Sequence, residues 1–166
     1  MLHFVDHDIT LRPASPADEP FLYQVYMSTR LEELASLPWD EAQRQAFLTM
    51  QFAAQRHHYH TQYNDASFEV ILCDGEPSGR LYVARWPEEI RIIDIALAPA
   101  YRGRGVGTAL ITSLLGEATR ARKRVRLHVE PTNRALRLYQ RLGFGVVAEH
   151  GLYLFMEWAP PVEAGA

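Results

Sequence analysis

Residues 94–115 read DIALAPAYRGRGVGTALITSLL, a stretch that predicts a strand, a loop rich in glycine and arginine, and a helix. The residues before Pro99 are apolar, and proline cannot donate to a strand ladder, so the strand should end there. From Val106 to Leu115, apolar residues recur at the spacing of one helix face. The loop should therefore lead directly into the first turn of a helix.

The loop carries alternating glycines at Gly103, Gly105 and Gly107, with cationic residues beside them. Glycine tolerates unusual backbone dihedrals and lets a ligand approach the main chain closely. Free N–H groups and the helix dipole favour an anion at the start of a helix. The forked donors of Arg102 and Arg104 match phosphate oxygens. The loop therefore predicts a phosphate or pyrophosphate site.

The spacing of the loop departs from two common phosphate-binding motifs. A Walker loop needs lysine followed by serine or threonine after its last glycine, and the loop has no lysine. A dinucleotide fingerprint begins at Gly103 and Gly105 but meets Thr108 where it needs glycine or alanine. What fits is Arg102, Gly105 and Gly107, an arrangement that resembles the acetyl-CoA pyrophosphate loop of the GNAT N-acetyltransferase superfamily.

A second motif follows the helix, where residues 127–144 read LHVEPTNRALRLYQRLGF. Asn133, Tyr139 six residues later, and the Gly143–Phe144 pair resemble the second diagnostic motif of GNAT domains. Two motifs in the family's order make the resemblance more specific than either motif alone. It extends over about residues 8–158.

The resemblance implies a mixed α/β (α+β) architecture, the GNAT acyl-CoA N-acyltransferase fold, with a mostly antiparallel central sheet of about seven strands and about four helices. Apolar or alternating patterns predict strands at residues 9–13, 68–73, 80–86, 90–97, 125–130, 144–147 and 152–158. Helices are expected after a capping box at Ser15–Asp18, from about residue 40 to about 58, after the glycine loop, and after Thr132 or Asn133. We expect a single domain over residues 1–166, with its core at about 8–158 and a frayed tail at 159–166.

Composition narrows the classes of function and location. The chain has 166 residues, 48% apolar and 22% charged, which suits one globular domain with a real core. A net charge of −3 gives no general reason to expect nucleic acid or an anionic membrane as a partner. The single cysteine, Cys73, excludes an intrachain disulfide and is expected to be a buried small residue rather than a nucleophile. Without a long apolar run or a signal-peptide pattern, a cytoplasmic location is expected.

By the resemblance, the acyl donor is acetyl-CoA, and no metal is implied. In the family, the strand before the loop splays from its neighbour, here residues 125–130. Backbone groups at about residues 95–97 are then expected to pair with the pantetheine arm and to polarise the thioester carbonyl. Asn133 is expected to hydrogen-bond the CoA chain. The implied cofactor-binding residues are Ile95, Ala96, Leu97, Arg102, Gly103, Arg104, Gly105, Val106, Gly107, Thr108, Asn133 and Tyr139.

The family reaction is direct acetyl transfer to an amine, which needs a proton donor for the leaving thiolate and a route for the amine proton. Tyr139 is implied as the general acid and is expected to project toward the cofactor rather than the core; the competing interpretation is that its ring packs with its apolar neighbours. A lysine-like amine has a pKa of about 10.4, so a base or a chain of water molecules is needed near neutral pH. Asp94 is the candidate base, although Glu88, Glu89 and Glu130 stay open as alternatives.

In GNAT-like domains the first two helices and their joint lie over the acceptor pocket. Glu32, Glu33 and Trp39 are therefore candidates for binding the acceptor, although the glutamates are also typical of a solvated helix and Trp39 of a core anchor. His57 and His60 have the spacing of a helical metal site. No carboxylate or cysteine lies at a suggestive interval from them, so a solvated helix end or a pocket wall fits them better.

The acidic residues of the first helical region favour a cationic small molecule or a peptide amine as the acceptor. The resemblance also allows a homodimer paired through terminal strands. A second hypothesis keeps the fold and the loop but not the chemistry: an acyl-CoA-binding sensor or assembly module, which would not need Tyr139. Release of CoA in the presence of an amine would distinguish the enzyme from the sensor.

Overall fold

The structure is a computed structural model that describes residues 2–4 and 7–162. Its strands are β1 (Leu2–Phe4), β2 (His7–Pro13), β3 (Ser67–Cys73), β4 (Glu76–Arg85), β5 (Glu89–Leu97), β6 (Arg124–Val129), β7 (Gly145–His150) and β8 (Tyr153–Trp158). Its helices are α1 (Glu19–Ala35), α2 (Glu41–Gln62), α3 (Val106–Ala121) and α4 (Leu136–Arg141), with 3₁₀ turns at Pro16–Asp18 and Pro99–Tyr101.

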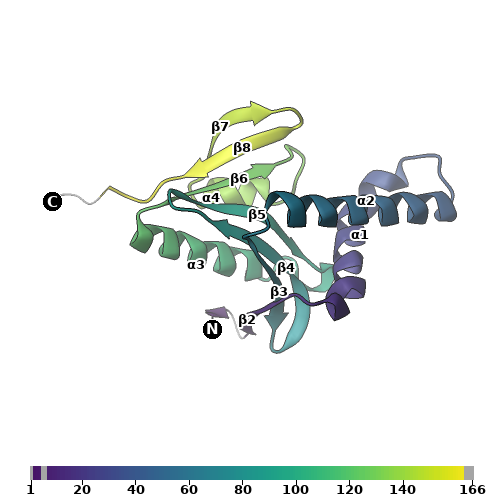
Figure 1. Ribbon diagram of the computed structural model, residues 1–166, viewed down its shortest axis with the longest axis horizontal. Coiled ribbons are helices and arrows are strands. Elements are labelled where there is room, and N and C mark those ends of the chain that lie inside the picture. Colours follow the sequence, from purple (N-terminus) through teal and green to yellow (C-terminus); the bar gives the residue numbers. More distant parts are fainter. Residues whose placement is uncertain (1, 5–6, 163–166) are drawn as a thin grey trace.

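Within the described residues, the eight strands form one sheet in the order β1-β2-β3-β4-β5-β6-β8-β7 (Figure 1). Neighbouring strands are antiparallel except β5 and β6, which are parallel and connected through α3. The predicted mostly antiparallel sheet and the four predicted helices are therefore confirmed, but α4 begins at Leu136 with Ala135 at its N-cap, so the predicted cap at Thr132 or Asn133 is wrong. The sequence patterns did not predict β1, which adds a short strand to the expected set.

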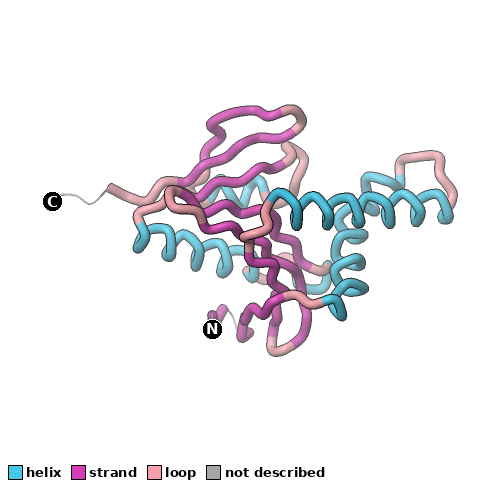
Figure 2. The backbone as a smooth tube through the Cα atoms, viewed as in Figure 1, coloured by secondary structure: helices cyan, strands magenta, loops and turns pink. Residues whose placement is uncertain are grey.

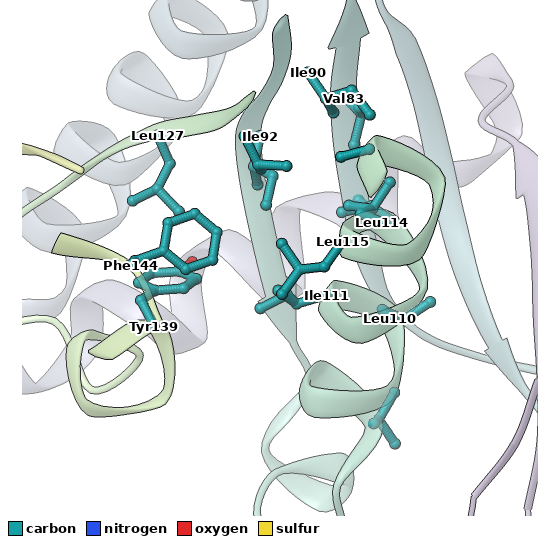
Figure 3. Packing of buried hydrophobic residues seen from close by; sticks show 14 of the residues in the cluster. Val83, Ile90, Ile92, Leu110, Ile111, Leu114, Leu115, Leu127, Tyr139 and Phe144 are labelled. Carbon is teal, nitrogen blue, oxygen red and sulfur yellow. The ribbon is translucent and has the colours of Figure 1, made fainter. Parts of the chain in front are cut away.

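The two faces of the sheet carry different helices. Val70 and Ile71 are consecutive residues of β3, both are fully buried, and they belong to different core clusters because side chains alternate along a strand. Ile71 packs in the larger cluster with residues of α3 and α4, part of which Figure 3 shows. Val70 packs in a smaller cluster with α1 and α2. In Figure 2 the strands (magenta) accordingly lie between α3 and the α1–α2 pair.

The β3–β4 hairpin is tighter than the sequence predicted. Asp74 and Gly75 both have positive φ, 51° and 83°, and these two residues complete the turn. Cys73 therefore pairs directly with Glu76, and β4 begins four residues before the predicted start at residue 80. As predicted, Cys73 is buried, and its thiol accepts a hydrogen bond from a neighbouring serine.

The turn before α1 is held by the carboxylate of Asp18. Its oxygens accept two hydrogen bonds from the guanidinium of Arg12, at 2.8 and 2.7 Å, and Asp18 Oδ2 also accepts from the backbone N–H of Ser15 at 2.8 Å. The backward reach of Asp18 predicted by the capping box is therefore present. The hydrogen bonds from Arg12, above all, lower the pKa of Asp18 to about 2.

Two further sequence-based expectations concern membrane spans and the C-terminal tail. None of the helices in residues 2–4 and 7–162 is long and apolar enough to cross a membrane. Residues 159–162 contain no helix or strand, as predicted for the tail, whereas residues 163–166 lie outside the described part of the chain.

Candidate active site

β5 and β6 separate part-way along their length. Their parallel pairing covers residues 89–92 of β5 and 124–127 of β6. β5 then continues to Leu97 beside β4, while β6 continues to Val129 beside β8. A bulge between Ile92 and Asp94 comes just before the point of divergence. The splay that the resemblance predicted beside residues 95–97 is therefore present.

The glycine loop connects the diverging end of β5 to α3. Gly103 and Gly105 have positive φ, 71° and 81°, a conformation that residues with a side chain adopt only under strain. The first helical hydrogen bond of α3 runs from the N–H of Ala109 to the carbonyl of Gly105, at 3.0 Å. The N–H groups of residues 106–108 therefore have no acceptor within the helix, as expected at a helix N-terminus. This is the geometry that suits a phosphate group.

The two arginines of the loop have different surroundings. Arg102 Nε donates to the carbonyl of Leu97 at 3.1 Å, and its Nη2 donates to Ser28 Oγ on α1, also at 3.1 Å. Arg102 thus ties the loop to the end of β5 and to α1. Arg104 is exposed, and its guanidinium carbon lies 6.0 Å from the ring centre of Tyr101. Of the two, Arg104 is better placed to reach a phosphate, although we expected both to do so.

Tyr139 lies on α4 and is only 5% exposed. Its ring makes an edge-on contact with Phe144, with ring centres 5.6 Å apart, inside the larger core cluster (Figure 3). We expected the side chain to project away from the core, and the structure corrects this. Burial first, and then the charge of Asp94, raise the pKa of Tyr139. The hydroxyl is therefore protonated at neutral pH and lies within electrostatic reach of Asp94.

Asp94, the candidate base, forms an ion pair with a buried arginine. Its Oδ2 lies 2.5 Å from Nη2 of Arg80, which comes from β4 and is only 4% exposed. The same Nη2 donates to Gln55 Oε1 of α2 at 3.0 Å. Burial, the largest single influence, lowers the pKa of Arg80, but the charge of Asp94, the hydrogen bond to it and the nearby tyrosines Tyr82 and Tyr59 together outweigh burial, and the pKa is raised overall. Arg80 therefore stays charged and holds Asp94 in place.

Sequence reasoning missed Arg80. The signal available was its position, two residues from Tyr82 in an otherwise buried strand, where alternation places both side chains on the same face. A charged residue at such a position is rare unless it is paired. The partner could not be identified from sequence, because the β5 bulge determines that Asp94 lies opposite Tyr82.

A cavity of about 570 Å³ lies between α1, the end of β6 and the β7–β8 hairpin. Its lining includes Arg30, the carboxylates of Glu130 and Glu149, and Tyr153. Glu130 is thus placed at a cavity near the splay, as the expected topology suggested. Glu89 is instead bonded to arginines at the other end of β5, and Glu88 lies exposed in the turn before it.

The other predicted site residues are placed as follows. Trp39 precedes α2 and packs against Phe47, with ring centres 5.1 Å apart. Glu32 and Glu33 lie on α1, but their side chains fall outside the described part of the structure. Asn133 Oδ1 accepts a hydrogen bond from the N–H of Ala135 at 2.8 Å, which orders the turn before α4.

His57 and His60 lie inside α2, which extends to Gln62 and thus past its predicted end. The ring of His60 packs on Phe68, with ring centres 4.3 Å apart. Across the part of the chain that the structure describes, no three His, Cys, Asp or Glu side chains gather in a way that could hold a metal ion.

Residues 28–144, which contain the glycine loop, the splay and Tyr139, match the model of the acetyltransferase (GNAT) family. The chain belongs to the acetyltransferase (GNAT) family. The resemblance inferred from the two sequence motifs, and the assignment to a family of acetyl-transferring enzymes, are thereby confirmed.

Known GNAT proteins resemble the chain in sequence and in fold. A streptothricin acetyltransferase from Streptomyces lavendulae is 30% identical over 108 residues, which cover 54% of the chain and 57% of the relative. The chain thus matches little more than half the length of this relative. The PaiA N-acetyltransferase of Thermoplasma acidophilum, solved in complex with coenzyme A, aligns with a TM-score of 0.67 at 20% identity, covering 92% of the chain and 99% of that structure.

PH1933 from Pyrococcus horikoshii has a similar fold, with a TM-score of 0.67 and 19% identity over 93% of the chain and 100% of that protein. At these identities the structures show the shared GNAT fold. The Thermoplasma acidophilum protein was solved with coenzyme A bound.

Proposed function

We propose that the protein is an N-acetyltransferase that moves the acetyl group of acetyl-CoA directly to a primary amine. One observation carries the proposal: the stretch of β5 that pairs with β4 but not with β6 leads through the glycine loop into the N-terminus of α3. An elongated ligand with a pyrophosphate at one end and a hydrogen-bonding arm at the other fits this arrangement. Acetyl-CoA has both parts.

In this proposal the pyrophosphate binds the N–H groups of Val106, Gly107 and Thr108, together with the side chain of Arg104. The pantetheine arm pairs with the backbone of residues 95–97, which β6 leaves uncovered. Arg102 holds the loop against β5 and α1 rather than contacting the phosphates. The site is thus built largely from main-chain groups, whose positions the sheet and α3 fix.

In the transfer step the amine nitrogen attacks the thioester carbonyl carbon, and the carbon–sulfur bond breaks. The hydroxyl of Tyr139 gives its proton to the departing sulfur, since its raised pKa keeps it protonated at neutral pH. The proton lost by the amine passes to a carboxylate, directly or through water. Asp94 is our candidate base, and Glu130 at the cavity is the alternative.

We infer that the acceptor is a cationic small-molecule amine that enters through the cavity lined by Glu130 and Glu149. Opposite charges attract an ammonium group to such a site before it loses its proton. The sequence relative is named as an acetyltransferase of streptothricin, which supports a small-molecule acceptor for this chain as well.

The second hypothesis, an acyl-CoA-binding module without catalysis, is favoured by two specific observations. The ring of Tyr139 is packed in the core, and Asp94 is already paired with Arg80. Catalysis requires the hydroxyl of Tyr139 to reach the sulfur from this packed position, whereas binding alone does not.

A thermal melt tests the cofactor first, with acetyl-CoA as the ligand and NAD and ATP as controls. Acetyl-CoA at a hundred times its Kd should stabilise the protein by about 2.7 kcal/mol. For a chain of this size, that is a rise in Tm of roughly 5 to 11 °C. A rise with NAD or ATP alone, or no rise with folded protein, would contradict the proposal.

A thiol-release assay with a panel of amines then separates the two hypotheses. Amine-dependent release of free CoA supports the enzyme. Stabilisation by acetyl-CoA without release for any polyamine, amino acid, aminoglycoside or peptide amine supports the binding module.

A further inference from the structure

Two exposed histidines, His128 of β6 and His150 of β7, meet across the intervening strand β8. Side chains alternate along a strand, so His128 points away from the core that its neighbours Leu127 and Val129 enter. The smaller core cluster, formed with α1 and α2, includes no residue of β6, β7 or β8. The two imidazoles are therefore open to ions from solvent, and the acetyltransfer proposed above does not use them.

The rings of the two histidines are held close together. Nε2 of His128 lies 3.0 Å from Nδ1 of His150. Both rings stack on Phe155 of β8, with ring centres 4.7 and 5.2 Å apart and angles of 28° and 23° between the planes. Strand pairing and the shared contact with Phe155 thus place the two nitrogens side by side before any ligand binds. Such preorganisation lowers the cost of binding a ligand that needs both.

The separation of the two nitrogens suits a metal ion as well as a hydrogen bond. In the metal-free pair, one nitrogen donates its N–H to the lone pair of the other. A metal ion that replaces this proton takes a lone pair from each ring. A Zn–N bond is about 2.0 to 2.1 Å, so two nitrogens bound to one ion at angles of about 90 to 109° lie roughly 2.8 to 3.4 Å apart. The observed distance of 3.0 Å falls in that range.

The cations nearest to Phe155 have carboxylate partners. The guanidinium carbons of Arg91 and Arg126 lie 5.2 and 5.9 Å from the centre of its ring. Arg91 donates to Glu89 at 3.1 Å, and Arg126 donates to Glu157 at 2.8 Å. These partners reduce the repulsion that the two arginines exert on a metal ion entering the site.

We propose that His128 and His150 form a binding site for a divalent transition-metal ion such as Zn²⁺, Ni²⁺ or Cu²⁺. Imidazole suits these ions, whereas Mg²⁺ and Ca²⁺ prefer oxygen ligands. Within residues 2–4 and 7–162, no group of three His, Cys, Asp or Glu side chains could hold a metal, so the pair supplies two ligands and water completes the shell. Binding is accordingly expected at micromolar concentrations of the metal.

The bound ion would connect β6 to β7 across β8. It would thereby fix the β7–β8 hairpin, whose residues Glu149 and Tyr153 line the cavity of about 570 Å³. The proposal does not depend on acetyltransfer, because it concerns metal binding by two side chains outside the proposed cofactor site.

Calorimetry with the chain free of any affinity tag tests the choice of metal. We expect Cu²⁺ to bind more tightly than Zn²⁺, as is usual for nitrogen ligands, and Mg²⁺ not to bind at the same concentrations. Failure of both Cu²⁺ and Zn²⁺ to bind at millimolar concentration overturns the proposal. Mg²⁺ binding as tight as that of Zn²⁺ also overturns it, since oxygen ligands would then be responsible.

Substitution of each histidine locates the ion. His128→Gln and His150→Gln each leave one imidazole, so Zn²⁺ binding should weaken by at least roughly tenfold, because the second, intramolecular contact is lost. The matched control is His57→Gln with His60→Gln, which removes the two helical histidines of α2 instead. The control should leave Zn²⁺ affinity unchanged. Equal weakening in the control, or unchanged affinity in both single variants, places the ion elsewhere and overturns the proposal.

A measurement on the unsubstituted chain keeps the proposal testable if the variants do not fold. Paramagnetic Cu²⁺, added well below one equivalent, broadens the NMR signals of nearby nuclei. The backbone amide signals of His128, His150 and Phe155 should broaden before those of His57 and His60. Broadening that begins at α2, or evenly over the whole chain, contradicts a site at the β6–β7 pair.

Discussion

Two arginine–aspartate pairs, Arg12–Asp18 and Arg80–Asp94, have the same chemistry but different surroundings. The first pair spans six residues across the turn before α1, and the arginine side chain is 39% exposed. The second connects neighbouring strands through an arginine side chain that is 4% exposed. Both are short contacts, so their geometry alone does not distinguish them. The contrast shows that the role of such a pair in stability and function depends on how deeply its arginine is buried and on the other contacts of that arginine.

The Arg12–Asp18 pair holds a local turn, and its guanidinium is exposed enough for water to solvate it if Asp18 is lost, although the Asp18 carboxylate is itself only 10% exposed. The buried pair places a charge inside the molecule, between the candidate base and a cavity. Removing one partner there leaves an uncompensated ion in a poorly solvated place. The two pairs should therefore respond differently to the same substitutions.

The largest effect is expected from Arg80→Met alone, which leaves Asp94 without its cation. Unfolding free energy should fall by about 3 to 5 kcal/mol, and adding Asp94→Asn should restore most of the loss. Urea denaturation of the single and paired variants at neutral pH measures both values. If the paired variant is as unstable as Arg80→Met, the loss comes from packing rather than charge, and the contrast with Arg12–Asp18 fails.

The Arg80–Asp94 pair should also matter for turnover, whereas the Arg12–Asp18 pair should not. Asp94→Asn should lower the amine-dependent rate by about 100-fold if Asp94 accepts the amine proton. Asp18→Asn is the matched control and should leave the rate unchanged in the folded protein. Steady-state thiol release with one amine measures both. A normal rate for Asp94→Asn would transfer the base role to Glu130.

The next prediction concerns Tyr139, whose pKa is raised by burial and by the charge of Asp94. Tyr139→Phe tests whether its hydroxyl takes part in catalysis. Loss of the hydroxyl should lower kcat by about 100-fold or somewhat less, with little change in acetyl-CoA affinity. The ring contact with Phe144 is retained, so stability should change little. Equal kcat values in the wild type and the variant would remove Tyr139 from the mechanism and favour the binding module.

The two loop arginines also differ in their surroundings: Arg102 is hydrogen-bonded to protein groups, whereas Arg104 is exposed. The expected effect on ligand binding is smaller than the effects above. Arg104→Glu should weaken acetyl-CoA binding by roughly tenfold, because a cation facing phosphate becomes an anion. The loss should shrink as salt is added. Unchanged affinity, measured by calorimetry, would place the phosphates elsewhere.

The smallest effect is expected from Asp18→Asn, about 1 kcal/mol of stability at pH 7 after allowing for the exposure of Arg12. The folded-state pKa of Asp18 is lowered to about 2, so its contribution is present above the unfolded pKa near 4 and is lost as pH falls toward 2. Wild type and variant should therefore converge in stability between pH 4 and pH 2. A constant difference across this range would contradict the charge-based account.

The sequence predicted the local features of the chain and missed the long-range ones. The reach of Asp18 back to Ser15, the glycines of positive φ and the start of α3 all depend on residues a few positions apart. The Arg80–Asp94 pair depends instead on the register between β4 and β5. A bulge shifts that register by one residue, and no single-sequence pattern marks it.

Tyr139 illustrates the same limit at the candidate site. Its position within the motif was clear from the sequence, but the direction of its ring depends on where α4 begins. The turn held by Asn133 delays the helix until Leu136, and Tyr139 then packs against Phe144 in the core. The family motif identified the residue, and tertiary packing determined its orientation.

The splay between β5 and β6 gives the sheet an edge in its interior. An open strand edge usually invites pairing with another chain, and proteins protect such edges by covering them. Here β6 pairs with β5 only as far as Ile92 and then continues beside β8, which leaves the backbone of residues 95–97 open on that side. A ligand arm lying along residues 95–97 would act as a short additional strand. Backbone amide exchange at these residues should then slow when the ligand binds, and the sheet would be continuous only in the occupied protein.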